Sequence, residues 1–74
     1  MKVEIYYCGV WNYLPAASRL EEELKGKYSG IEVELNKGSG GIFKVVNDGA
    51  LIFDKAESAR FPDENEIIKL IEDL

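Results

Sequence analysis

The sequence predicts a single α/β domain built from a four-stranded mixed sheet and two helices. Apolar residues alternate with polar ones in four short segments, and in two longer segments they recur every three or four residues. The resulting order of elements, β-α-β-β-β-α, is typical of one sheet packed against helices. A chain of 74 residues has the length of one domain, so residues 1–74 are expected to form one folding unit. The expected strands are Val3–Tyr7, Ile31–Leu35, Ile42–Val46 and Ala50–Asp54, and the expected helices are Leu14–Lys27 and Asp63–Asp73.

The first strand and the first helix are joined by a loop that follows the only cysteine. By alternation, Val3, Ile5 and Tyr7 fall on one face of the strand, whereas Cys8 falls on the other. Pro15 suits the first turn of the helix, where its missing N–H is not needed. The apolar stripe of this helix consists of Leu14, Ala17, Leu20, Leu24 and Tyr28.

Two polar motifs are interpreted as structural. Glu21, Glu22 and Glu23 crowd one turn of the helix, and a solvated face is favoured over a metal site because no partnering ligand lies near them. The glycine-rich segment Gly38–Gly41 is interpreted as a connection between strands. A phosphate-binding loop would need a following Lys-Ser or Lys-Thr pair and a helix, whereas strand-forming residues follow here.

An Asp-Gly pair at 48–49 stands between two segments rich in strand formers and predicts a β-hairpin. Glycine accepts the positive φ that a two-residue turn requires. The expected register places Val45 opposite Ile52 and Val46 opposite Leu51. Both faces of the hairpin are then apolar, which favours a central or doubly covered position in the sheet and would also permit a dimer.

The last helix is expected to begin at Asp63. The side chain of Asp63 can cap the helix, and Glu66 three residues later completes a capping-box pattern. The buried stripe of this helix consists of Ile67, Leu70, Ile71 and Leu74.

The composition excludes several classes of function. The formal net charge of −5 opposes unspecific binding to nucleic acid and to anionic lipid. A chain with no histidine and one cysteine cannot form a thiolate/imidazole zinc site, a Ser-His-Asp triad or an internal disulfide. Neither a signal peptide nor a membrane-spanning run is recognised. We therefore expect a cytoplasmic domain with no metal and no bound cofactor.

The expected topology places Cys8 at a position that favours function. The first two strands are joined through a helix and should be parallel, while the last two form an antiparallel hairpin. This is a minimal thioredoxin-like arrangement, with Cys8 at the C-terminal end of the first strand. Ligands and reactive groups collect at such strand ends in α/β units.

Three segments in order carry a resemblance to a known family. Val3–Pro15 contains the opening strand and a cysteine loop, Gly40–Lys55 a glycine-led hairpin, and Ala59–Ile71 an Arg-Phe-Pro entry to the last helix. Together they resemble the selenoprotein W / Rdx family of small thioredoxin-like domains, which is grouped with selenoproteins T and H. The resemblance covers nearly the whole chain.

The resemblance implies a thiol- or selenol-dependent redox role in the cytoplasm, often linked with glutathione. Cys8 matches the first position of the family's C-x-x-C or C-x-x-U motif, and Trp11 matches the second. An indole cannot attack a mixed disulfide, so cycling between a dithiol and an internal disulfide is excluded. Cys8 is then the sole candidate nucleophile, a monothiol with glutathione as its expected redox partner. A misread selenocysteine position is an alternative origin of Trp11, because the two codons differ by one base.

Two further interpretations of this loop stay open. No cationic residue lies between Lys2 and Arg19 to stabilise a thiolate locally, so Cys8 is alternatively an inert, half-buried residue. The loop is alternatively the contact surface of a redox-inert protein-interaction module, in which Trp11 and Tyr13 dock a partner. The residues of this candidate partner surface are Gly9, Val10, Trp11 and Tyr13.

Overall fold

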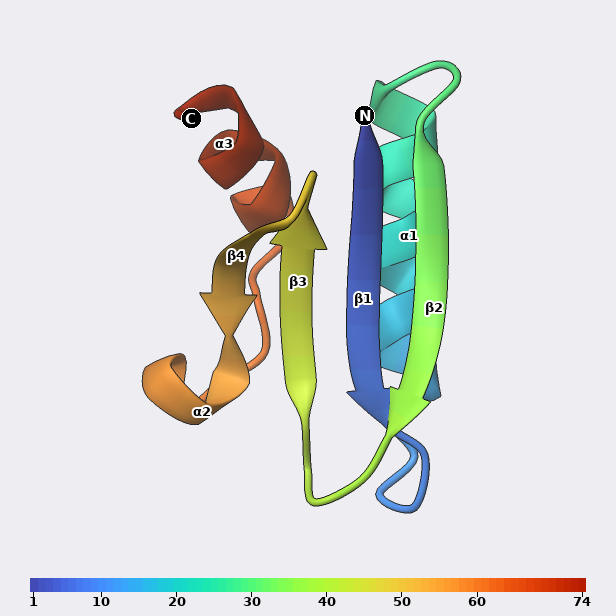
Figure 1. Cartoon of the computed structure of the whole chain (residues 1–74), viewed down its shortest axis with the longest axis vertical. Helices are drawn as coiled ribbons and strands as arrows, with labels where there is room; N and C mark the ends of the chain where they lie inside the picture. The colour runs from blue at the N-terminus through green and yellow to red at the C-terminus, as the bar shows by residue number, and fades with distance from the viewer.

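The computed structural model describes all 74 residues. Its strands are β1 (Lys2–Cys8), β2 (Glu32–Gly38), β3 (Phe43–Asn47) and β4 (Ala50–Asp54), and its helices are α1 (Leu14–Lys27), α2 (Lys55–Ser58) and α3 (Glu66–Glu72). The strands form one four-stranded sheet in the order β2-β1-β3-β4 (Figure 1). β1 and β2 are parallel and are joined through α1, whereas β3 is antiparallel to both β1 and β4. The predicted mixed-sheet α/β fold is confirmed.

The core lies between one face of the sheet and the helices. α1 passes behind β1 and β2 in Figure 1, and no helix covers the face of the sheet that is turned toward the viewer. Apolar side chains from three strands, α1 and α3 meet in a single cluster behind the sheet. Its members are Val3, Ile5, Ala17, Leu20, Leu24, Phe43, Val45, Phe53, Ile67 and Ile68.

The Asp-Gly hairpin is present, but its register is only partly as predicted. Val46 lies opposite Leu51 as expected, whereas Val45 lies opposite Phe53 instead of Ile52. A β-bulge accounts for the difference, because the extra residue on β4 shifts the pairing and turns Phe53 into the core beside Val45. The expectation that the hairpin has a central or doubly covered position holds for only one of its strands. β3 is an inner strand, but β4 is an edge strand and Leu51 is exposed.

Element boundaries differ from the prediction where pairing extends a segment. The predicted strand Ile31–Leu35 is observed as Glu32–Gly38, because its last three residues continue the parallel ladder with β1 as far as Cys8. The predicted strand Ile42–Val46 begins and ends one residue later, as Phe43–Asn47. The short helix α2 is not among the predicted elements. It is one turn long and begins after Asp54, whose carboxylate accepts the N–H of Ala56.

The last helix begins at Glu66, three residues later than predicted. The side chain of Asp63 does not cap it, and Asn65 at its N-terminus has a φ of 66°. One half of the predicted capping box is nevertheless present, since Glu66 Oε1 accepts the N–H of Asp63 at 2.8 Å. The same carboxylate binds Arg60 through two hydrogen bonds of 2.7 and 2.9 Å. Glu66 therefore orders the segment that precedes the helix. The left-handed conformation of Asn65 places the first helical residue at Glu66.

Candidate thiol site

Cys8 ends β1 and is completely buried, with 0% of its surface exposed. It nevertheless stands outside the contiguous apolar cluster of the core. The chain turns directly after it, and the N–H of Gly9 donates to the carbonyl of Gly38 at the end of β2. The sulfur is thus enclosed by backbone at the carboxyl ends of two parallel strands.

The loop after Cys8 folds back over the sulfur. The N–H of Asn12 donates to the carbonyl of Gly9 at 3.1 Å, and the N–H of Tyr13 donates to the carbonyl of Cys8 at 2.9 Å. Asn12 has a φ of 59°, in the left-handed region that asparagine tolerates better than most residues. This turn directs the N–H of Trp11 at Cys8 Sγ, at a distance of 3.4 Å.

The second wall of the site is the glycine-rich loop between β2 and β3. Gly40 and Gly41 have φ values of 70° and 76°, which glycine adopts without the strain that a side chain brings. A β-carbon placed on Gly41 would lie 2.5 Å from Cζ3 of Trp11, so the indole packs directly on this glycine. The loop leads into β3 and not into a helix, which agrees with its interpretation as a strand connection.

Backbone donors at the site act on the acidity of the thiol. Burial raises the pKa of the Cys8 thiol, but backbone hydrogen bonds from Trp11, Gly41 and Val10 lower it by more, so the pKa lies below its ordinary value. Backbone N–H groups aimed at a sulfur stabilise its anion in the way that other oriented donors stabilise anions. Sequence reasoning missed Gly41, because the contribution of a distant loop to a site has no local pattern.

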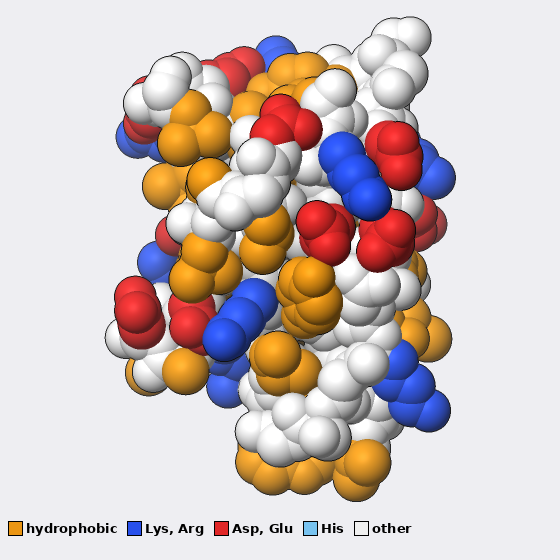
Figure 2. Space-filling model, in the orientation of Figure 1, with side chains coloured by type: hydrophobic (Ala, Val, Ile, Leu, Met, Phe, Trp, Pro, Cys, Tyr) orange, Lys and Arg blue, Asp and Glu red, His pale blue; other side chains and the backbone are white.

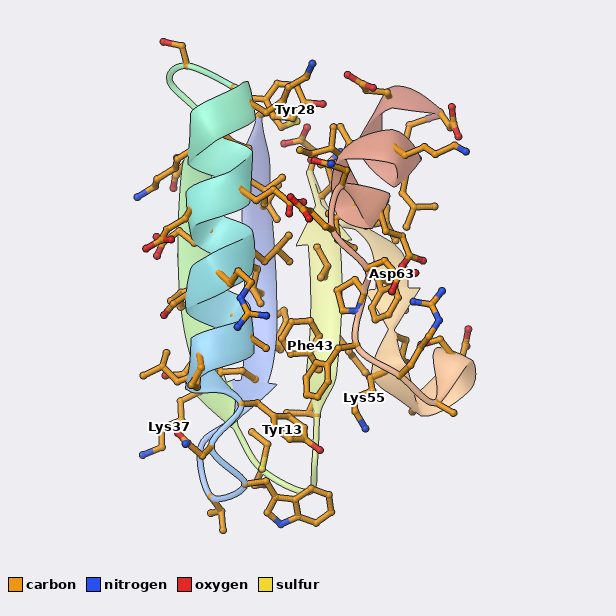
Figure 3. The ribbon with its side chains drawn as sticks, turned by 180° about the vertical axis from the view of Figure 1, so that it is seen from behind. Tyr13, Tyr28, Lys37, Phe43, Lys55 and Asp63 are labelled. Atoms are coloured by element: carbon orange, nitrogen blue, oxygen red, sulfur yellow. The ribbon has the colours of Figure 1, made fainter.

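The cations of the chain do not pair with this sulfur. The stem of Lys37 on β2 lies over Gly9, where a β-carbon would clash with it. In Figure 3 the Lys37 side chain points away from Tyr13 and toward solvent. Arg60 is engaged by Glu66. The thiol therefore depends on backbone N–H groups.

A row of aromatic rings runs from the thiol loop into the molecule. Trp11 contacts Tyr13 edge-on at a centroid distance of 6.1 Å, Tyr13 contacts Phe61 at 4.8 Å, and Phe61 contacts Phe43 at 5.1 Å. The Lys55 ammonium lies 5.5 Å from the Tyr13 ring and 5.3 Å from the Phe61 ring (Figure 3). Such edge contacts and cation–π contacts stabilise the arrangement of the rings. Trp11 and Tyr13 were predicted as site residues. Their partners Phe61, Phe43 and Lys55 were not.

The outer part of the loop is exposed. Val10 is 81% exposed and Trp11 is 61% exposed. Figure 2 shows hydrophobic side chains gathered at the end of the molecule that carries this loop. The four residues predicted as a partner surface thus include two large apolar side chains in contact with solvent.

The structure contains neither a metal-binding cluster nor a membrane-spanning helix. No three side chains of the His, Cys, Asp or Glu type come together in an arrangement that could hold a metal ion. No helix has both the length and the apolar character needed to span a bilayer.

A small thioredoxin-like domain with one thiol at the end of its first strand is the class of protein that this fold and site define. The family model described as the Rdx family matches residues 2–73, and the chain belongs to the Rdx family.

Known proteins and solved structures agree with this assignment. The crystal structure of a selenoprotein W-related protein from Vibrio cholerae superimposes with a TM-score of 0.92 at 28% identity, covering 97% of this chain and 92% of that one. A crystal structure of a protein from Bordetella parapertussis has the same TM-score, 0.92, at 27% identity, covering 97% of this chain and 94% of that one.

Curated relatives are longer than this chain. "Migration and invasion enhancer 1" from Bos taurus is 31% identical over 71 residues, which are 96% of this chain and 62% of the relative. The protein of the same name from Mus musculus is 30% identical over 69 residues, which are 93% of this chain and 60% of the relative. The chain therefore spans about three-fifths of the length of these relatives.

Proposed function

We propose that this protein is a cytoplasmic monothiol redox protein that exchanges glutathione through Cys8. The observation that carries the proposal is the N–H of Trp11, which donates to Sγ at 3.4 Å and, together with the backbone N–H groups of Gly41 and Val10, lowers the pKa of the thiol. The thiolate is the species that attacks a disulfide. Membership of the Rdx family supports a redox role on this fold.

The chemical step is a thiol–disulfide exchange. The Cys8 thiolate attacks one sulfur of glutathione disulfide, so that a Cys8–glutathione bond forms, the original disulfide breaks, and one glutathione thiolate leaves and takes up a proton. A second thiolate, from glutathione or from a client protein, then attacks the glutathione sulfur and releases Cys8. Trp11 offers no sulfur, so this second thiolate must come from outside the chain.

Access to the sulfur requires the loop to open. Cys8 has no exposed surface, and the Trp11 indole bridges the cysteine loop and the glycine-rich loop by its contact with Gly41. The indole is itself 61% exposed, so it can move outward without leaving a cavity in the core. Opening of this cover precedes attack on a disulfide.

The test is incubation with glutathione disulfide at several pH values, followed by measurement of intact mass. We expect one glutathione adduct per chain, with a rate that reaches half of its maximum at a lower pH in the folded chain than in the urea-unfolded chain, because the folded thiol has the lower pKa. Cys8→Ser is the control and should form no adduct. A folded protein that reacts only near the ordinary thiol pKa of about 8.5 would overturn the proposal.

A second candidate function is a redox-inert interaction module that uses the Trp11/Tyr13 loop. The favouring observation is the exposure of Trp11 and Val10 at one end of the molecule. Large exposed aromatic residues are enriched at the centres of protein interfaces. In this case capture of a protein partner from cell extract should survive Cys8→Ser and be lost in Trp11→Ala. Leu51→Ala, at a residue 52% exposed on β4, is the matched control for loss of exposed apolar surface.

A further inference from the structure

A groove of about 570 Å³ separates α1 from the segment that leads into α3. Figure 3 shows Phe43 between α1 and the segment that carries Asp63. The volume is within the range of about 300–1,000 Å³ that is usual for ligand sites. The lining residues are Ala16, Arg19, Leu20, Glu22 and Glu23 from α1, Phe43 from β3, and Phe61, Pro62, Asp63 and Glu64.

The groove has an apolar floor and acidic walls. Leu20 and Phe43 are core residues, 6% and 1% exposed, and Phe61 packs edge-on against Phe43. The walls carry the carboxylates of Glu22 and Glu23 beside the cationic Arg19 on one side, and those of Asp63 and Glu64 on the other. An apolar strip between two acidic walls is complementary to a ligand that has an apolar body and cationic ends.

Two of the wall carboxylates have no partner within the protein. Glu23 accepts the N–H of Asn65 at 3.0 Å, and Asp63 lies 3.9 Å from Arg60. Glu22 and Glu64, by contrast, take part in no ion pair or side-chain hydrogen bond and face solvent on opposite walls. They are free to bind cationic groups of a ligand.

Arg19 indicates which kind of cationic ligand fits. This residue lines the same groove, is exposed and forms no ion pair. A guanidinium carries only donors, which the carbonyl groups of a peptide can accept and a protonated polyamine cannot. We propose that the groove binds an extended peptide segment in which basic side chains flank an apolar one. The basic groups bind Glu22 and Glu64, the apolar side chain lies on Leu20, Phe43 and Phe61, and peptide carbonyls accept from Arg19. The proposal does not depend on the chemistry of Cys8.

The test uses fluorescein-labelled Gly-Arg-Leu-Arg-Gly and measures polarisation at low and high salt. Two control peptides replace both arginines by glutamate, or the leucine by serine. We expect binding of the first peptide that weakens with added salt, since exposed ion pairs are screened, no binding of the acidic peptide, and weaker binding of the serine peptide. Absence of binding at low salt, or equal binding of the leucine and serine peptides, would overturn the proposal.

Matched variants separate the groove from the overall negative charge. The double change Glu22→Lys and Glu64→Lys should weaken peptide binding by about tenfold or more. The double change Glu57→Lys and Asp73→Lys alters the net charge equally at exposed residues outside the groove, and should leave most of the affinity intact. Circular dichroism checks that both variants fold. Equal loss in the two variants would assign the binding to net charge and reject the groove.

Discussion

The indole of Trp11 packs directly on Gly41, so two loops that are remote in sequence enclose the sulfur of Cys8. Both residues also act on the sulfur through their backbone N–H groups. Trp11 thus contributes both a donor to the sulfur and a cover over it. This relationship is the basis of the first two predictions.

Gly41→Ala should destabilise the protein more than Gly40→Ala. Both glycines have positive φ, so each substitution brings backbone strain of about 1 kcal/mol. Only at Gly41 does the added methyl group meet the Trp11 ring, which must shift and lose part of its contact, whereas the space around Gly40 is open. Urea unfolding measures the difference. Equal losses would mean that the contact between Trp11 and Gly41 is absent in solution.

Protein stability should rise with pH as the Cys8 thiol ionises. The pKa of Cys8 is lower in the folded chain than in the unfolded one, so the unfolded chain binds more protons between the two values. The added stability is therefore absent below the folded pKa and complete above the unfolded value of about 8.5. Urea unfolding at pH values across this window measures how the free energy of unfolding changes with pH, and Cys8→Ser is the control. A wild-type profile parallel to that of Cys8→Ser would contradict the lowered pKa.

Trp11→Cys should allow an internal disulfide with Cys8 to form. The turn that directs the N–H of Trp11 at Sγ brings position 11 next to Cys8, and a second thiol there completes the C-x-x-C motif. Oxidation should then yield a monomer that has lost two hydrogen atoms. Val10→Cys, at an 81% exposed residue, is the control and should form disulfide-linked dimers instead. Intact mass under native conditions distinguishes the two products, and dimers from both variants would contradict the loop geometry.

Glu66→Gln should lower the free energy of unfolding at neutral pH but leave it unchanged in strong acid. The two hydrogen bonds from Arg60 and the N–H of Asp63 lower the pKa of Glu66 to about 2. Because this folded pKa lies below the unfolded value of about 4.3, the contribution is complete above pH 4.3 and is lost as pH falls toward 2. Arg60 is half exposed, so solvent screening limits the loss to about 1 kcal/mol.

Urea unfolding between pH 2 and 7 tests this prediction, with Glu64→Gln as the control at an exposed carboxylate that has no ion-pair partner. The two variants should differ at neutral pH and converge in acid. A constant difference over the whole range would show that Glu66 acts through packing and not through its charge.

Several elements were predictable because their cause is local. The spacing of Leu20 and Leu24 with the proline at the first turn predicts α1 with its observed bounds. The Asp-Gly pair predicts the hairpin turn, and Asp48 and Gly49 both have positive φ. The bulge on β4 was not predictable, since it depends on Phe53 reaching the core across from Val45.

By itself, the sequence determined the order of the elements other than α2, the mixed sheet and the place of Cys8 at the end of the first strand, because periodicity and turn chemistry act over a few neighbouring residues. Only the tertiary structure decided what surrounds the sulfur and where the groove lies. The donor from Gly41, the indole against that glycine and the acidic walls on either side of Phe43 come from segments far apart in the chain. Sheet order and helix packing bring these segments together, and neither leaves a repeating pattern in the residues concerned.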